Sequence, residues 1–186
     1  MTSKPRSASE QLAAKLWTHR GQARPDFARP PGPNEESVWD YPRPPALMPD
    51  SRKIEVEVDG RIVAESRKTI RVLETASPPT FYIPPEDVAS DLLQANSSRS
   101  HCEWKGFATY WDFVDAATSI ASVGWSYPQP TPEFDAVAGW FSFYPAKAIC
   151  RVDGHLVRAQ EGGFYGGWVT PEVVGPFKGE PGTGGW

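Results

Sequence analysis

Strict alternation of apolar and polar residues is the clearest pattern in this chain. Residues 54–58 (IEVEV) alternate, Asp59-Gly60 supplies a two-residue turn, and residues 61–64 resume the apolar pattern. This arrangement is typical of a β-hairpin, because an Asp-Gly turn matches the twist of two paired strands. Asp153-Gly154 repeats the signal within residues 149–157, so a second hairpin is expected there.

Further strands are expected where short apolar or aromatic runs lie between turn signals. They are residues 69–74, 80–83, 102–104, 107–113, 125–128 and 139–144. Pro78-Pro79 is expected to break a strand, because proline lacks the amide donor of a β-ladder. One short helix is predicted between Pro84 and Leu93. Strands at this spacing predict a mainly β fold with one compact sandwich- or barrel-like body.

The first residues of the chain differ from this body. Residues 9–19 predict a helix with a narrow apolar stripe of Leu12, Leu16 and Trp17, which must dock on another surface. The predicted organisation is a helical arm (1–23), a Pro-rich strap (24–50) and a β domain (51–186).

The strap contains eight of the 20 prolines within residues 24–49. Proline fixes φ and removes amide donors, so this segment is expected to be extended. Trp39 and Tyr41 are expected to anchor it on the body through their large rings. A disordered linker is the alternative.

The charge of the chain divides unevenly. The net charge is −4; residues 1–49 hold seven Lys/Arg and five Asp/Glu (+2), and the remainder holds twelve and eighteen (−6). An acidic body does not attract phosphate backbones, so nucleic acid is not an expected partner. No apolar run approaches the roughly 20 residues that span a bilayer, and the polar N-terminus lacks an apolar signal segment. We therefore expect a cytoplasmic protein without a membrane partner.

Metal and disulfide chemistry have few candidate side chains. Cys102 and Cys150 form at most one bridge, and neither belongs to a CxxC pair. The three histidines are scattered at positions 19, 101 and 155. A Cys/His zinc site therefore lacks ligands, and we expect neither a metal nor a cofactor.

Several segments together resemble one protein family. They are SVWDYPRPP (37–45), RVLET (71–75), PPTFYIPPEDV (78–88), HCEWKGFATYWDF (101–113), GWSYPQPTPEF (124–134) and the C-terminal YGGWVTPEVVGPFKGEPGTGGW. The chain is similar over residues 37–186 to domain of unknown function 427, found in bacteria, fungi and plants. The resemblance implies a β-tent fold, shared with methionine sulfoxide reductase B and the Mss4-like zinc proteins. Relatives on that fold often carry a CxxC pair of zinc ligands, which this chain lacks.

The family is also labelled nucleotidyltransferase-like, and the sequence does not support that activity. Such transferases hold Mg²⁺ with paired carboxylates, often Asp-x-Asp. The nearest candidates, Asp112 and Asp115, have the wrong spacing and would point to opposite faces of a strand. No Gly-rich loop lies between a strand and a helix, where a phosphate would bind.

The densest group of reactive side chains lies at residues 100–106 (SHCEWKG). In a strand, Cys102 and Trp104 would face one way and Lys105 the other. A bend at Gly106 would bring Lys105 towards Cys102, where an ammonium group favours the nucleophilic thiolate. The alternative is a buried Cys102 packed as a small hydrophobe beside a solvated Lys105.

Arg71 and Glu74 lie three residues apart in one expected strand, so they face opposite ways unless a bulge intervenes. The functional interpretation is that Arg71 offers its planar donor group to an acidic or carbonyl ligand. The alternative is an ion pair with the strap or with a neighbouring strand.

These observations lead to two hypotheses of different class. In the first, the domain binds a small molecule, and whether it is also an enzyme stays open. The catalytic candidates are Cys102, Lys105 and Tyr127, and the ligand-binding candidates are Arg71, Glu74, Tyr82, Trp104, Tyr110 and Trp125. The aromatic residues would instead belong to the core if no pocket forms. In the second hypothesis, the domain is a non-catalytic interaction module, in which the Pro-rich strap and the terminal Trp residues serve assembly. A homo-oligomer would then form through the N-terminal arm.

The cysteine and histidine pattern predicts a metal-free protein. Because Cys102 and Cys150 lack paired ligands, the purified protein is expected to contain no stoichiometric zinc. Elemental analysis measures this directly, and about one zinc per chain would contradict the prediction.

Overall fold

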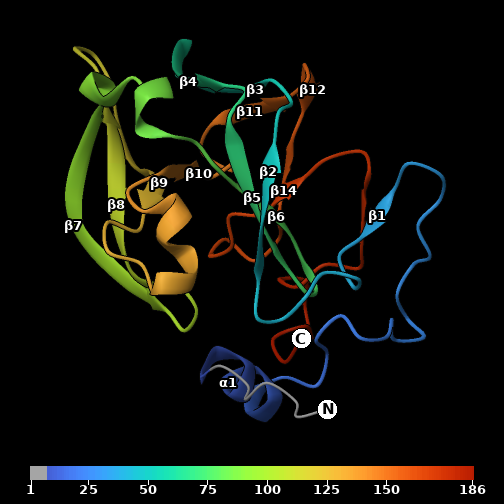
Figure 1. The fold of residues 1–186 in the computed structure, drawn as a ribbon. Coiled ribbons are helices and arrows are strands. Elements are labelled where there is room, and N and C mark those ends of the chain that lie inside the picture. The colour runs from blue at the N-terminus through green and yellow to red at the C-terminus, as the bar shows by residue number, and fades with distance from the viewer. Residues whose placement is uncertain (1–7) are drawn as a thin grey trace.

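The strands of the body form several small sheets (Figure 1). The computed structural model describes residues 8–186; the fold is mainly β, and none of its sheets closes into a barrel. The strands are β1 (Glu36–Ser37), β2 (Ala46–Asp50), β3 (Ile54–Val58), β4 (Arg61–Ser66), β5 (Thr69–Glu74), β6 (Ser77–Tyr82), β7 (Leu93–Cys102), β8 (Gly106–Val114), β9 (Ser119–Ser126), β10 (Phe141–Phe143), β11 (Ile149–Val152), β12 (His155–Leu156), β13 (Arg158–Ala159), β14 (Trp168–Val169) and β15 (Val173–Val174). The helical pieces are α1 (Ala8–Leu16) and the 3₁₀ turns η1 (Pro85–Asp87), η2 (Ser90–Leu92) and η3 (Pro132–Val137). Across residues 8–186 no helix has both the length and the apolarity needed to span a bilayer.

The two predicted hairpins meet in one sheet, in the order β12-β11-β3-β4. Asp59 and Gly60 both adopt positive φ (49° and 75°), as the tight turn requires. The alternation of β3 buries Ile54, Val56 and Val58 and leaves the intervening glutamates at the surface. Both hairpins are confirmed.

A second sheet, β10-β9-β8-β7, is built from longer strands than the sequence indicated. Strand β7 begins at Leu93, and its polar, largely exposed residues carry no apolar signal. The expectation of a strand through Trp104 was wrong, because residues 103–105 form the turn that joins β7 to β8. The region predicted as one short helix contains the 3₁₀ turns η1 and η2.

The third sheet has the order β2-β5-β6, and β6 runs through both prolines. The expectation that Pro78 and Pro79 break the strand was wrong. Within this sheet β6 is an edge strand, and its register with β5 shifts between Val72 and Glu74, opposite the two prolines, where missing amide donors are tolerated. The strap contributes β2, which pairs antiparallel with β5.

The main core lies between these sheets and is rich in large apolar residues. Its fully buried members include Phe81, Phe113, Phe143 and Trp168. The Trp168 indole donates to the Phe143 carbonyl at 3.0 Å, so its polar atom is satisfied inside the core. A second cluster, around Tyr82, Trp125 and Tyr127, is the one that borders the candidate site.

The strap lies across the body, as its aromatic residues predicted. Trp39 is 0% exposed and Tyr41 is 5% exposed. The Trp39 indole donates to the Pro176 carbonyl at 3.0 Å, and its ring contacts Phe27 and Trp186 edge-on. The strap is therefore anchored, and the alternative of a disordered linker does not hold for this segment.

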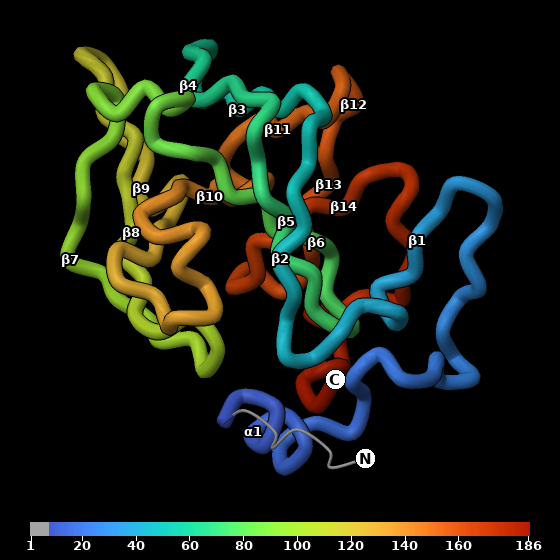
Figure 2. The backbone as a smooth tube through the Cα atoms, viewed as in Figure 1, coloured from blue at the N-terminus to red at the C-terminus, as the bar shows by residue number. Residues whose placement is uncertain are grey.

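The helix α1 lies beneath the body, close to the C-terminal end of the chain (Figures 1 and 2). Ala13 is buried, and Leu12 and Trp17 pack against the second cluster. Leu16 is 53% exposed, so the expected stripe of Leu12, Leu16 and Trp17 was wrong at that position. The helix docks through a smaller face, because Ala13 lets it approach closely.

The burial of Trp39 predicts a large loss of stability in Trp39→Ala. Removing a buried tryptophan costs about 3–5 kcal/mol in the free energy of unfolding, because it leaves a cavity and breaks the bond to Pro176. Denaturant titration measures the loss, with Phe107→Ala as control, because Phe107 is 69% exposed. Equal stabilities of the two variants would show that the strap contributes nothing to folding.

Candidate functional site

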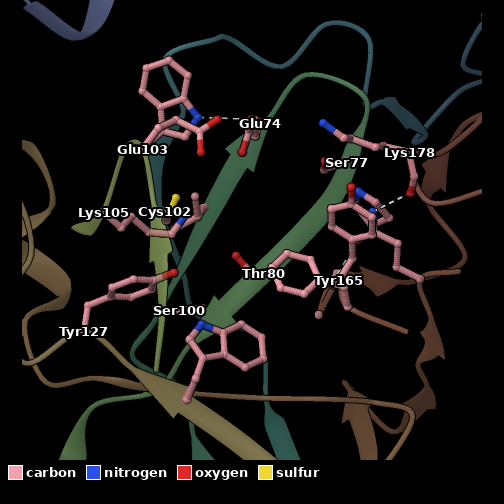
Figure 3. A pocket seen from close by; sticks show the side chains of 18 of the residues that line it. Glu74, Ser77, Thr80, Ser100, Cys102, Glu103, Lys105, Tyr127, Tyr165 and Lys178 are labelled. Carbon is pink, nitrogen blue, oxygen red and sulfur yellow. Dashed lines mark hydrogen bonds between the residues drawn. The ribbon is translucent and has the colours of Figure 1, made fainter. Parts of the chain in front are cut away.

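A pocket of about 350 Å³ opens between the β5–β6 hairpin, the β7–β8 turn and the C-terminal segment (Figure 3). Eight of the nine candidate residues line it: Glu74, Tyr82, Cys102, Trp104, Lys105, Tyr110, Trp125 and Tyr127. The lining also includes residues that the sequence did not single out, among them Trp17, Thr80, Tyr144, Tyr165 and Lys178.

The floor of the pocket follows from strand alternation. Val72 and Glu74 of β5 face the pocket, and the facing strand β6 adds Thr80 and Tyr82. Arg71 directly precedes Val72 in the strand and therefore belongs to the opposite face of the sheet. The expectation that Arg71 points into the cleft was wrong.

Arg71 is held in an ion-pair network on that opposite face. Its guanidinium pairs with Glu36 of the strap, and Nε lies 3.1 Å from a carboxylate oxygen of Asp50. Arg52 pairs with Asp50 and Glu172 in the same network. Burial raises the pKa of Asp50, whereas hydrogen bonds from Arg52 lower it, and the net shift of this pKa is downward. Arg71 thus ties the strap to the body, as the alternative interpretation had it.

The β7–β8 turn brings Cys102 and Lys105 to one wall of the pocket (Figure 3). Cys102 is the last residue of β7 and pairs with Gly106, the first residue of β8. Gly106 has a φ of 88°, a backbone conformation that residues other than glycine rarely adopt. It lets the chain reverse directly after Lys105. The bend that would place the ammonium group near the thiol is therefore present.

Lys105 is 8% exposed. Its ammonium group lies 5.7 Å from the Tyr127 ring and 5.5 Å from the Phe134 ring. Among residues 8–186 it has no carboxylate partner within ion-pairing distance, and its side-chain hydrogen bond is with the sulfur of Cys102 rather than with an oxygen. A cation that is buried in aromatic surroundings without an ion pair is energetically costly.

The protonation of Lys105 follows from its neighbours. Burial lowers the pKa of Lys105, whereas Tyr82 and Cys102, when deprotonated, and Glu74 raise it, and the net direction is upward. Lys105 therefore carries its proton near neutral pH.

The aromatic wall is formed by Tyr82, Trp125, Tyr127 and Tyr144. The Trp125 indole donates to the Tyr82 hydroxyl at 3.2 Å, and the Trp125 and Tyr144 rings lie 4.5 Å apart. Burial raises the pKa of Tyr127 well above its usual range, so its hydroxyl stays protonated and is a hydrogen-bond donor. Tyr110 also lines the pocket, but its hydroxyl is paired with Ser100 at 2.8 Å.

The outer end of the pocket carries mixed charges. Glu74 accepts hydrogen bonds from Arg43 at 3.1 Å and from the Trp104 indole at 3.3 Å. Arg43 and Lys178 both lie over the ring of Trp17, at 4.3 and 4.2 Å from its centroid. Burial, followed by the charge of Arg43, lowers the pKa of Lys178. The second cation of the pocket is therefore Lys178 and not Arg71.

Several of the residues that sequence reasoning missed come from the two ends of the chain. Trp17 belongs to the arm, and Tyr165 and Lys178 to the Gly-rich C-terminal segment. The glycine at position 166 marks where the C-terminal segment passes the aromatic wall, because a Cβ there would lie 2.1 Å from the Trp125 ring. Only glycine lets the backbone pass so close to the aromatic wall.

Asp112 and Asp115 do not form a paired-carboxylate site. Asp112 accepts hydrogen bonds from Asn96 and from the Ser122 amide, whereas Asp115 pairs with Arg61. Within the described part of the chain, no group of three or more His, Cys, Asp or Glu side chains is placed to hold a metal ion. The two carboxylates therefore serve separate local contacts.

Comparison with known proteins gives a family but no function. The family described as domain of unknown function (DUF427) matches residues 46–158. No curated protein matches the chain. The matched segment builds the floor, the β7–β8 turn and the aromatic wall, whereas Trp17, Tyr165 and Lys178 lie outside it and cover the pocket.

The environment of Lys105 predicts that Lys105→Met does not destabilise the fold. Methionine has a similar length and removes a buried charge that lacks an ion pair, so the melting temperature is expected to stay the same or to rise by a few degrees, at about 2–4 °C per kcal/mol. Differential scanning calorimetry measures the change. A melting temperature several degrees lower would show that Lys105 serves the fold rather than a ligand.

Proposed function

Because the chain belongs to the family described as domain of unknown function (DUF427), a description that names no reaction, we propose a function from the pocket itself. The domain binds a small molecule that places an acceptor oxygen against Lys105 and a flat body against the aromatic wall. The observation that carries the proposal is the buried Lys105 ammonium group, which faces the pocket without a partner oxygen among residues 8–186.

The energetics favour a ligand over a purely structural role. A desolvated ammonium group costs several kcal/mol unless an oxygen accepts its hydrogen bonds. The aromatic rings at 5.5 and 5.7 Å offset only part of that cost. A carboxylate, phosphate or carbonyl oxygen would complete the hydrogen bonding of Lys105, and charge-assisted bonds of this kind are the strong ones.

The shape of the pocket indicates the rest of the ligand. A cavity of about 350 Å³ is at the small end of the range for ligand sites, which suits a metabolite with one or two rings. Trp125 and Tyr127 present ring surfaces to it, and flat bodies pack favourably against such surfaces. Thr80 and Ser77 add hydroxyl groups for orientation.

The alternative of an assembly module has less support. The anchoring rings of the strap, Trp39 and Tyr41, are buried in their own chain and are not presented to a second one. The proposal also includes a cytoplasmic location, because Cys102 and Cys150 are free thiols, which is usual in a reducing compartment.

A ligand screen tests the proposed function. Arenecarboxylates such as 2-naphthoate are expected to change the tryptophan fluorescence of the wild-type protein, because Trp125 lines the pocket. In Lys105→Met the affinity should fall by about 10- to 100-fold, the equivalent of one hydrogen bond to a charged group.

Lys68→Met is the matched control, because Lys68 is an exposed lysine away from the pocket. It should bind 2-naphthoate as the wild type does. Equal affinities in wild type, Lys105→Met and Lys68→Met would contradict the proposed role of Lys105.

A further inference from the structure

We infer that Cys102 is a nucleophile that captures a carbonyl ligand as a reversible covalent adduct. The inference rests on the proposed function and narrows the ligand to an aldehyde or ketone with a flat body. The thiol would form a bond to the carbonyl carbon while the carbonyl oxygen takes the position facing Lys105.

The geometry places the reacting groups on one wall. Cys102 is partly exposed, lines the pocket and is a free thiol. Lys105 follows it by three residues across a tight turn, and Tyr127 directs its hydroxyl into the same space (Figure 3). A carbonyl bound at the thiol would therefore meet two hydrogen-bond donors, an ammonium group and a phenol. Donors aimed at a developing oxyanion are the usual means of promoting addition to a carbonyl.

The step balances without a co-reactant. The sulfur of Cys102 forms the C–S bond as the π electrons of the carbonyl move to oxygen. The oxygen takes a proton from the Lys105 ammonium group, and the thiol proton restores that ammonium group. Thiol and carbonyl thus give a thiohemiacetal, no atom is lost, and the reverse steps release the ligand unchanged.

Lys105 itself is not the nucleophile. An amine must lose its proton before it attacks a carbonyl, and lysines that do so have a lowered pKa. The groups around Lys105 instead shift its pKa upward, which keeps it a donor.

Disulfide chemistry is also not indicated by the arrangement. Cys150 is 0% exposed and belongs to the main core, whereas Cys102 packs with the second cluster at the pocket. Burial strongly raises the pKa of the Cys150 thiol. Cys102 therefore has no partner thiol among residues 8–186, and its reactivity is directed to whatever enters the pocket.

The test uses the full-length protein and 2-naphthaldehyde labelled with ¹³C at the carbonyl. The carbonyl resonance of the bound aldehyde is expected to move to the region of saturated carbons bonded to one oxygen and one sulfur. In Cys102→Ala this resonance should be absent, and the affinity for the aldehyde should fall by about tenfold or more. Cys102→Ser preserves the size of the side chain, so it repeats the test if alanine disturbs the turn.

The matched acid, 2-naphthoate, separates this inference from the proposed function. It cannot form the adduct, so the ratio of aldehyde affinity to acid affinity should fall by about tenfold or more from wild type to Cys102→Ala. Binding of 2-naphthoate without any aldehyde adduct would overturn the role of Cys102 and leave the proposed function standing. Binding of neither compound would overturn both.

Two further outcomes would also overturn the inference. An adduct of equal strength in wild type and Cys102→Ala would place the reacting group elsewhere. A mass increase on Lys105 that becomes permanent after borohydride reduction would show an imine, and hence an amine nucleophile in place of the thiol.

Discussion

The buried guanidinium group of Arg43 is the contact on which both the arm and the pocket depend. Its side chain is 0% exposed, and it donates to Glu74 of β5, to the Thr75 carbonyl at 2.7 Å and to the His19 carbonyl at 3.3 Å. Burial lowers the pKa of Arg43, and the charge of Glu74 acts against that shift. A buried cation of this kind is stable only when every donor finds an acceptor. The strap, the end of β5 and the segment after α1 are thereby fixed together.

The shape of the pocket entrance depends on the contacts of Arg43. Glu74 is held by Arg43 on one side and by the Trp104 indole on the other, so its carboxylate has a fixed place at the pocket entrance. Arg43 also packs on Trp17, which in turn contacts Lys178. The entrance is thus a network of satisfied charges, whereas the inner end holds the one lysine of the pocket that lacks an oxygen partner within residues 8–186. This contrast makes Lys105, rather than the more numerous charges near the entrance, the feature that points to a ligand.

Sequence reasoning succeeded where the physical cause is local. The Asp-Gly turns fix their hairpins within a few residues, and the turn that joins Cys102 to Lys105 needs only the glycine that follows. It failed where the cause is distant. Whether Pro78 and Pro79 end a strand depends on the neighbours of β6, and the face on which Arg71 lies depends on which side of β5 the core occupies. Lys178 could not be assigned to the site, because nothing near it in the sequence shows that the C-terminal segment returns to Trp17.

The pocket has two parts with different positions in the chain. Its floor and the β7–β8 turn lie within residues 46–158, and its cover comes from Trp17 at one end and Tyr165 and Lys178 at the other. The cover is therefore structurally separate from the floor, since it adds no strand to the sheets that form the floor. Exchange of the terminal segments would change the cover and leave Cys102 and Lys105 in place. Under the proposed function, the selectivity for a ligand and the contact with its acceptor oxygen are in this way separable properties of one small domain.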